Sequence, residues 1–305
     1  MPPKSKLKAV APTAAKPSRP KILIYGKPGT GKTYNSLNFP SCYYIDTEGG
    51  ANLEHYTNRL AASGGVYLGP ENGSNDFDVV LDQVQALVTE PHPYRTLVID
   101  SISHLFGTEV ANEQERMAKE NRKDEWGASR KGATGYMRRI VNWLDRLDMN
   151  VILIAHHKDE YGLVRGKREV VGSTFDGPEK IEYILHLALH ITKEGASRKA
   201  RVRKSRILEF QTDGVGSSFE WSYDEFADRY GREVIEAGVK VITLATKEQL
   251  AETERLMKIV RMPDDWFEKC LKRGKSETIN DMEADHVAAM ITMLNQRATD
   301  TTIGA

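Results

Sequence analysis

The chain has 305 residues, of which 40% are hydrophobic, enough for one large domain or for a core domain with a smaller appendage. Its 43 basic residues balance its 43 acidic residues, so nothing global attracts a polyanion and any nucleic-acid contact must come from local patches. No apolar run approaches the length of a membrane span and no secretory leader is recognisable, so we expect a soluble, cytoplasmic protein without a membrane partner.

Residues 1–20 carry five basic and no acidic side chains among Pro, Ala and Ser. Such a segment buries too little apolar surface to fold, so we expect a disordered basic tail. It serves either as a solubilising leader or as an arm that contacts DNA nonspecifically.

An apolar run beginning at Lys21 meets a glycine-rich turn that ends in Lys32-Thr33. The pattern G-x-x-x-x-G-K-[ST] predicts a P-loop, because the N–H groups of the turn and the N-terminus of the following helix can bind phosphate oxygens. Lys32 would reach the β- and γ-phosphates of ATP, and the Thr33 hydroxyl would hold Mg²⁺. The expected nucleotide-binding residues are Gly26, Lys27, Pro28, Gly29, Thr30, Gly31, Lys32, Thr33 and Tyr34.

Two further apolar runs, at residues 42–46 and 94–100, are predicted strands that end in acids. Ligands of open α/β sheets collect at the carboxyl ends of strands, so these acids point towards the nucleotide. Glu48 is placed to orient or deprotonate the attacking water, although Asp46 or Glu48 could instead cap the next helix. Asp100 has the position of a Walker B acid that binds the Mg²⁺ side of the site, with Ser101 and Ser103 as weaker candidates.

The segment at 77–88 has helical spacing and predicts a helix that covers the sheet. Residues 113–133 are highly charged and contain glycines, so we expect a mobile segment before an amphipathic helix at 136–147. Residues 151–155 predict a fourth core strand that ends at His156 and His157. A histidine at this edge lies where a γ-phosphate sensor would lie, and His156 is the better candidate.

The stretch from 158 to 178 has little periodicity and predicts a long flexible loop on the nucleotide edge. Residues 200–207 alternate apolar and basic side chains, as a half-buried strand with a cationic face does. That face is either solvated, in contact with DNA phosphates, or a source of cations for the ATP of a neighbouring subunit.

In the order and spacing of these motifs, residues 20–212 resemble the RecA-like ATPase core, and within it the phage ATPases of the Sak type, which are implicated in single-strand annealing and recombination. The resemblance implies an α/β fold, a P-loop NTPase core with a central, mainly parallel sheet. It implies catalytic roles for Lys32, for Glu48 as general base and for His156, which stands where RecA and the DnaB-type helicases carry a glutamine that senses the γ-phosphate. Lys204 and Arg206 resemble the Lys-x-Arg finger pair that acts across a subunit interface, so hydrolysis is expected to depend on a homo-oligomer.

The same resemblance places a DNA-binding loop at 158–177. The residues expected to contact single-stranded DNA are Arg122, Lys123, Arg130, Lys131, Arg165, Lys167 and Arg168. Trp126 and Tyr161 are the stacking aromatics near them. Phosphate contacts of this kind give sequence-indifferent, salt-dependent binding. The expected partners are single-stranded DNA, further copies of the chain and a single-strand-binding protein, in the host cytoplasm if the protein is phage-encoded.

The segment at 219–241 either completes the core or acts as a linker. From Thr246 onwards, a capping box and three apolar helical faces predict a small three-helix bundle, similar to the helical tails of other phage recombination proteins. The expected organisation is therefore a tail at 1–20, an ATPase core at 21–242, a C-terminal helical domain at 246–297 and a disordered tail at 298–305.

Two other functions stay open. A P-loop kinase acting on a small molecule would need a lid with paired arginines, for which only Arg138-Arg139 is a match, inside a helical pattern. A nucleotide-dependent scaffold of the KaiC or helicase-loader type would use ATP to control assembly, and the zero net charge and missing glutamine favour it.

Overall fold

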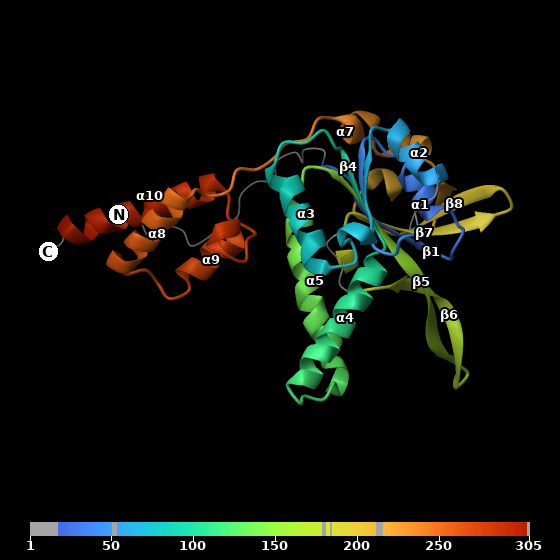
Figure 1. Cartoon of the computed structure of the whole chain (residues 1–305), viewed down its shortest axis with the longest axis horizontal. Helices are drawn as coiled ribbons and strands as arrows, with labels where there is room; N and C mark the ends of the chain where they lie inside the picture. The colour runs from blue at the N-terminus through green and yellow to red at the C-terminus, as the bar shows by residue number, and fades with distance from the viewer. Residues whose placement is uncertain (1–17, 51–53, 179–180, 184, 212–215, 304–305) are drawn as a thin grey trace, which may run out of the picture.

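The computed structural model describes residues 18–50, 54–178, 181–183, 185–211 and 216–303. The described strands form one sheet that lies between two layers of helices (Figure 1). The strands are β1 (Lys21–Gly26), β2 (Cys42–Asp46), β3 (Val66–Leu68), β4 (Thr96–Asp100), β5 (Asn150–Val164), β6 (Lys167–Asp176), β7 (Leu187–Glu194), β8 (Ser197–Ser205) and β9 (Ser218–Glu220). The helices are α1 (Lys32–Ser36), α2 (Glu54–Ala62), α3 (Phe77–Thr89), α4 (Ile102–Lys119), α5 (Ala128–Arg146), α6 (Tyr223–Tyr230), α7 (Arg232–Glu236), α8 (Lys247–Ile259), α9 (Trp266–Arg273) and α10 (Ala284–Ile303).

The strand order is β3-β2-β4-β5-β1-β7-β8-β9, with β6 paired to β5. From β3 to β7 every neighbouring pair on this path is parallel, whereas β6, β8 and β9 pair antiparallel. The carboxyl ends of β1, β2 and β4 therefore meet at one edge of the sheet, together with His156 of β5, which pairs with Gly26. This confirms the predicted α/β fold with a mainly parallel central sheet.

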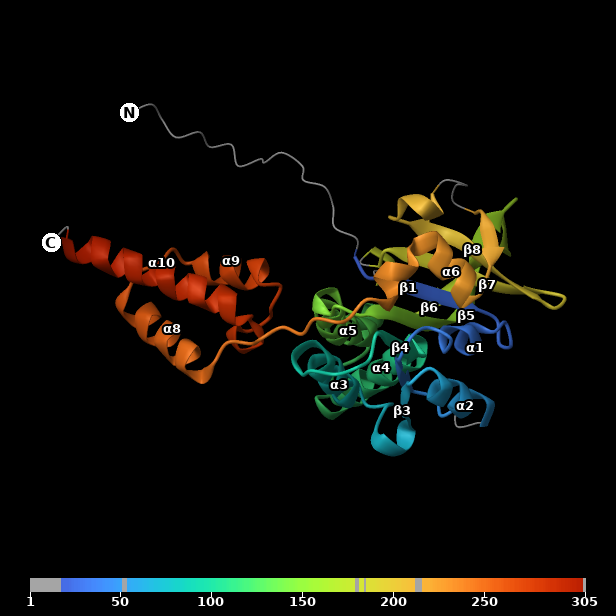
Figure 2. The ribbon, with the colours of Figure 1, turned by 90° about the horizontal axis from the view of Figure 1, so that it is seen from above.

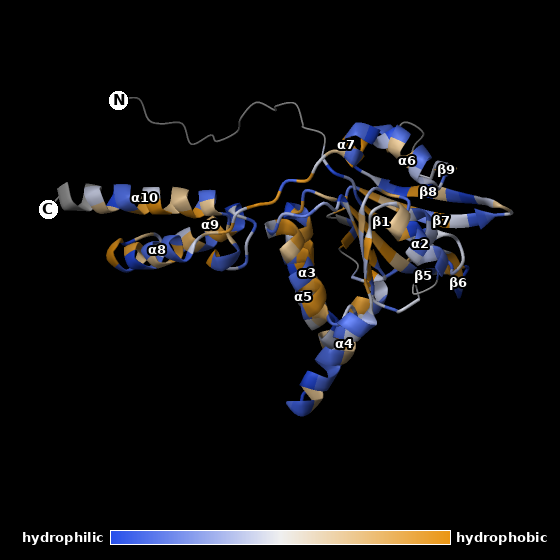
Figure 3. Cartoon of the chain, turned by 45° about the horizontal axis from the view of Figure 1, so that its top comes forward, coloured by the Kyte–Doolittle hydropathy of each residue, from blue (hydrophilic) through white to orange (hydrophobic). Residues whose placement is uncertain are grey.

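Strand β1 is buried along its whole length because helices cover both of its faces. Leu23 and Tyr25 belong to the apolar cluster formed with α3, α4 and α5. Ile22 and Ile24 belong to a second cluster, formed with α6 and α7. Figure 3 shows the resulting hydrophobic strands between helices whose outer faces are hydrophilic.

The predicted mobile segment at 113–133 is wrong, because α4 and α5 form an antiparallel helical hairpin there (Figure 1). Asp124 orders the turn by accepting hydrogen bonds from the backbone N–H and the hydroxyl of Ser129, at 2.9 and 2.7 Å. The two helices pack against each other, and Met117 on α4 and Ala133 on α5 are both buried. The many charged residues lie on the solvated faces of the two helices. The apolar stripe is so narrow that the sequence pattern did not reveal it.

The predicted flexible loop at 158–178 is also wrong, because β5 continues into an antiparallel hairpin with β6. Its turn consists of Arg165 and Gly166, which both have positive φ angles, 50° and 77°, between the paired residues Val164 and Lys167. A two-residue turn with this backbone matches the twist of a hairpin. The dipeptide Arg165-Gly166 was the feature of the sequence that could have predicted this hairpin turn.

The start of the predicted tail is ordered, since Arg19 is buried and donates to the carbonyl oxygens of Val234, Ile235, Ala237 and Gly238 at 2.5 to 3.1 Å. The tail prediction is therefore wrong for residues 18–20, and residues 1–17 lie outside the described part of the chain. The segment at 219–241 completes the core, because Trp221, Phe226 and Ile235 are buried against the sheet.

Helices α8, α9 and α10 pack around an apolar cluster of their own that contains Leu256, Trp266 and Leu294. The capping box at Thr246 and Gln249 is present at the start of α8. Figure 2 shows these helices set apart from the sheet, and Lys275 and Asp145 form an ion pair of 2.5 Å between the two parts. Helix α10 continues to Ile303, so the predicted disordered tail is wrong for 298–303, while 304–305 lie outside the described residues. None of the helices in the described ranges has the length and apolar character needed to cross a membrane.

Candidate nucleotide-binding site

The P-loop lies between β1 and α1, where the sequence predicts it. A side chain at Gly26 would overlap the carbonyl oxygen of Ile191, so only glycine lets β1 run this close to β7. Gly29 and Gly31 have φ angles of +75° and +84°, a left-handed conformation that glycine adopts without strain. The Thr30 hydroxyl donates to the carbonyl of Lys27 at 2.9 Å and closes the turn.

The Lys32 ammonium donates to two carbonyls of the same loop, those of Gly26 at 2.8 Å and Lys27 at 3.1 Å. Burial lowers the pKa of Lys32, while the nearby Asp100 and Glu48 carboxylates act in the opposite direction. The cation is thus partly desolvated and held beside the turn, where phosphate oxygens would be stronger partners than carbonyls.

Thr33 and Asp100 form the base of the site. The Thr33 hydroxyl donates to Asp100 Oδ2 at 2.5 Å, and the Tyr44 hydroxyl approaches the same oxygen at 3.2 Å. Burial raises the pKa of Asp100 to about 6; the Thr33 hydrogen bond lowers it and the Glu48 and Asp46 carboxylates raise it further. A cation bound at this point would stabilise the negative charge of the buried Asp100 carboxylate.

The donors here fit Mg²⁺, because a hydroxyl and a carboxylate oxygen are the hard ligands that this ion prefers. They line a cavity of about 380 Å³ together with Lys32, Glu48 and His156. Within the described residues, no group of three or more His, Cys, Asp or Glu side chains could hold a metal. Mg²⁺ in nucleotide sites binds one or two protein oxygens together with phosphate oxygens and water, and Thr33 and Asp100 would be the protein ligands here.

Glu48, Ser101 and His156 meet beside this pair; Glu48 and Ser101 follow the ends of β2 and β4, and His156 lies within β5, where it pairs with Gly26. His156 Nε2 lies 2.6 Å from Glu48 Oε1 and 3.2 Å from the Ser101 hydroxyl, which donates to the same Glu48 oxygen. The Glu48 and His156 side chains remain 38% and 50% exposed, so water reaches both. Asp46, which accepts from the N–H groups of Glu48 and Gly49 at 3.0 and 2.9 Å, shapes the turn that directs Glu48 here.

Ser103 joins the site to β6. Its hydroxyl accepts from the backbone N–H of His156 at 2.8 Å and donates to the carbonyl of Asp176. The two serines that the sequence ranked as weaker candidates thus hold the backbone of β5 at His156 and the Glu48 carboxylate. His157 does not join them, because its ring is mostly buried, lies 3.0 Å from Asp159 Oδ1 and stacks on His190.

Sequence reasoning missed Arg198, at the start of β8. Its Nε would lie 3.2 Å from a Cβ placed on Gly31, so the guanidinium stands beside the N-terminus of α1. Its Nη1 donates to the carbonyl of Ala196 at 2.6 Å. The basic pattern at 200–207 begins two residues later, and only the pairing of β7 with β8 brings Arg198 to the P-loop.

The structure does not bring Lys204 and Arg206 to the P-loop of their own chain. Lys204 pairs with Ala188, which pairs with Leu23, three residues before Gly26. Its ammonium donates to the carbonyl of Leu185 at 3.0 Å, near the amino end of β7.

The predicted DNA-binding residues lie on two projecting hairpins. Arg122 and Lys123 follow α4, and Arg130 and Lys131 lie on α5. Arg165, Lys167 and Arg168 lie at the tip of the β5–β6 hairpin, in its turn and at the start of β6. Trp126 is fully exposed between α4 and α5, and Tyr161 is 53% exposed under the Arg168 guanidinium. Figure 1 shows both hairpins extending from the sheet on the same side.

A glycine-rich turn between a strand and a helix, a Thr–Asp pair at its base and a water-accessible glutamate just after β2 define a P-loop NTPase core. A family model described as an AAA domain matches residues 18–215, and the chain belongs to this family of P-loop ATPases. No curated protein matches the chain.

Proposed function

We propose that the protein is a RecA-like ATPase that hydrolyses ATP with Mg²⁺, binds single-stranded DNA and promotes annealing or recombination. The convergence of Lys32, the Thr33–Asp100 pair and the Glu48–Ser101–His156 cluster around one cavity carries the ATPase part. The two hairpins with basic side chains and exposed aromatics support the DNA part.

In the proposed reaction, a water oxygen attacks the γ-phosphorus in line with its bond to the β–γ bridging oxygen. That bond breaks, and ADP leaves with the bridging oxygen. Glu48 takes the proton of that water, and the Ser101 and His156 contacts hold its carboxylate in position. Lys32 exchanges its two carbonyl partners for phosphate oxygens. When bound, Mg²⁺ supplies positive charge next to the phosphates, with Thr33 and Asp100 as its protein partners.

DNA binding through these hairpins would be indifferent to sequence. Basic side chains contact backbone phosphates, and Trp126 and Tyr161 offer ring faces on which bases stack. Affinity would fall steeply with salt because each phosphate contact releases counterions.

We further propose that the active form is a homo-oligomer in which Lys204 and Arg206 act on the ATP of a neighbouring subunit. Their position away from their own P-loop is compatible with action in trans. Leu163, Val170 and Val171 are more than half exposed on the β5–β6 hairpin, an apolar surface suited to a second copy of the chain. A single-strand-binding protein would be a partner that delivers the DNA.

The test is ATP hydrolysis by the purified protein without nucleic acid, with single-stranded DNA and with duplex DNA, at low and moderate salt. Stimulation that is selective for single strands and fades with salt is the expected result. Equal rates in all three samples would remove the DNA part. Transfer of phosphate to an added nucleotide would favour a kinase.

A nucleotide-gated scaffold is the second candidate function. Two features favour a protein in which ATP hydrolysis is secondary to assembly. His156 stands where the resembling ATPases carry a glutamine, and Lys204 and Arg206 lie away from the P-loop of their own chain. Size-exclusion elution with and without ATP distinguishes the two, because a scaffold assembles with ATP alone. A kinase lid finds less support, since Arg138 lines a different cavity from the one that contains Lys32.

A further inference from the structure

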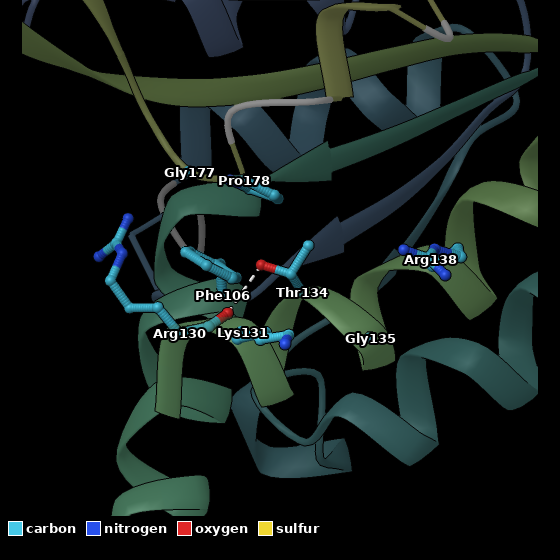
Figure 4. A pocket seen from close by; sticks show the side chains of 8 residues that line it. All are labelled: Phe106, Arg130, Lys131, Thr134, Gly135, Arg138, Gly177 and Pro178. Carbon is cyan, nitrogen blue, oxygen red and sulfur yellow. Dashed lines mark hydrogen bonds between the residues drawn. The ribbon is translucent and has the colours of Figure 1, made fainter. Parts of the chain in front are cut away.

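A second cavity, of about 540 Å³, opens between α4, α5 and the segment after β6 (Figure 4). Three of its lining residues are cationic and none is acidic. Arg130 and Arg138 stand on opposite sides of Thr134, and Pro178 closes the cavity from the other side. The lining residues are Phe106, Arg130, Lys131, Thr134, Gly135, Arg138, Gly177 and Pro178.

The three cations lack carboxylate partners, since none of them forms an ion pair with any residue in the described ranges. Arg130 lies over the buried Phe106 ring, 5.1 Å from its centroid, and its carbonyl accepts from the Thr134 hydroxyl at 2.7 Å. Gly135 contributes no side chain, and a Cβ there would meet no atom within 4 Å. Three like charges around one hollow repel each other, and an anion between them removes that repulsion.

We propose that this cavity binds backbone phosphates of single-stranded DNA and that its occupancy reaches the ATPase site through Ser103. The inference rests on the proposed DNA-binding function. The cavity is larger than one phosphate group needs, which suits consecutive phosphodiesters. Arginine supplies a planar fork for phosphate oxygens and lysine a point charge, so this set of side chains recognises phosphate rather than a base.

The path between the two sites is short and consists of direct contacts. Gly177 and Pro178 line the cavity, and the carbonyl of the preceding Asp176 accepts from the Ser103 hydroxyl. The same hydroxyl accepts from the N–H of His156, whose ring contacts Glu48. Ser103 also precedes Phe106 by three residues on α4, so the helix that forms the cavity wall carries the connecting hydroxyl. A phosphate that moves residues 176–178 therefore changes the support of His156.

The binding test uses the full chain and a fluorescent oligothymidylate, with affinity measured by anisotropy across a salt series. The variant Arg130→Gln/Lys131→Gln/Arg138→Gln removes the three charges. The control Lys240→Gln/Lys247→Gln/Lys258→Gln removes the same net charge from the chain that follows the sheet. With about 0.7 released counterions per single-strand phosphate, the cavity variant should lower the slope of log K against log salt by about 2 and the control should not.

The coupling test uses Ser103→Ala, with Ser103→Thr as the conservative variant. Ser103 is a positioning residue, so Ser103→Ala should retain oligothymidylate affinity and lose the stimulation of ATP hydrolysis by DNA, and Ser103→Thr should restore it. Stimulation that persists in Ser103→Ala would overturn the path.

The failures are distinguishable. If the wild-type chain binds oligothymidylate and the cavity variant binds it with the same affinity and slope, the cavity assignment is wrong and the proposed function stands. If the wild-type chain binds no single strand, both fall. Displacement of the oligonucleotide by thymidine monophosphate or inorganic phosphate at equal phosphate concentration would identify a small-anion site and overturn the backbone assignment.

Discussion

Replacing Asp100 by Asn should stabilise the nucleotide-free protein while it abolishes the binding of nucleotide with Mg²⁺. The carboxylate is held among Thr33, Tyr44 and the acids Asp46 and Glu48, and burial raises its pKa from an ordinary value of 3.8 to about 6. At about 1.4 kcal/mol per pH unit, the ionised carboxylate lowers the free energy of unfolding at pH 7 by up to about 3 kcal/mol. The amide keeps an oxygen that accepts from Thr33 and carries no charge.

The dependence on pH has a definite sign. Because the folded-state pKa is the higher one, the folded chain binds the proton more tightly, and Asp100 favours folding most below about pH 4. That contribution is lost as the pH rises towards 6. The advantage of Asp100→Asn should therefore be largest at pH 7 and about half as large at pH 5.

The assay is urea unfolding with EDTA at pH 7 and pH 5, with Asp264→Asn as an exposed control. With Mg²⁺ and ATP the order should reverse, since ligand at about 1,000 times its dissociation constant stabilises the wild-type chain by about 4.1 kcal/mol and the variant binds none. A nucleotide-free Asp100→Asn protein that is no more stable than the wild-type chain at pH 7 would refute the reasoning.

Three further predictions concern the same site. Glu48→Gln should retain ATP affinity and lower turnover by roughly 10²- to 10⁴-fold in steady-state assays, and unchanged hydrolysis would reduce Glu48 to a structural residue. Arg198→Gln should weaken ATP binding by roughly tenfold or more in equilibrium titrations, the size of a lost charge-assisted hydrogen bond, with Arg198→Lys intermediate; an unchanged dissociation constant would place the guanidinium outside the nucleotide site. Mixing Lys204→Ala with Lys32→Ala should restore hydrolysis that neither variant has alone, provided that native mass spectrometry detects mixed oligomers, and no restoration in such mixtures would remove the finger assignment.

Much of the catalytic edge follows from the sequence alone. The P-loop is a local motif, and its glycines, Lys32 and Thr33 are adjacent in the chain. Asp100, Glu48 and His156 could be assigned to one edge because each follows an apolar run that predicts a strand, and parallel strands align such positions at the same edge of a sheet. Burial of the strands on both faces made these apolar runs recognisable.

Other features depend on contacts that only the folded chain makes. Arg198 reaches Gly31, 167 residues earlier in the chain, because β8 pairs with β7 and β7 with β1. Likewise, Met117 and Ala133 in the charged segment at 113–133 are buried in a hairpin in which α4 packs against α5. Local composition does not predict such long-range pairing. The tertiary structure alone therefore decided which basic side chains lie beside the P-loop and which surround the second cavity.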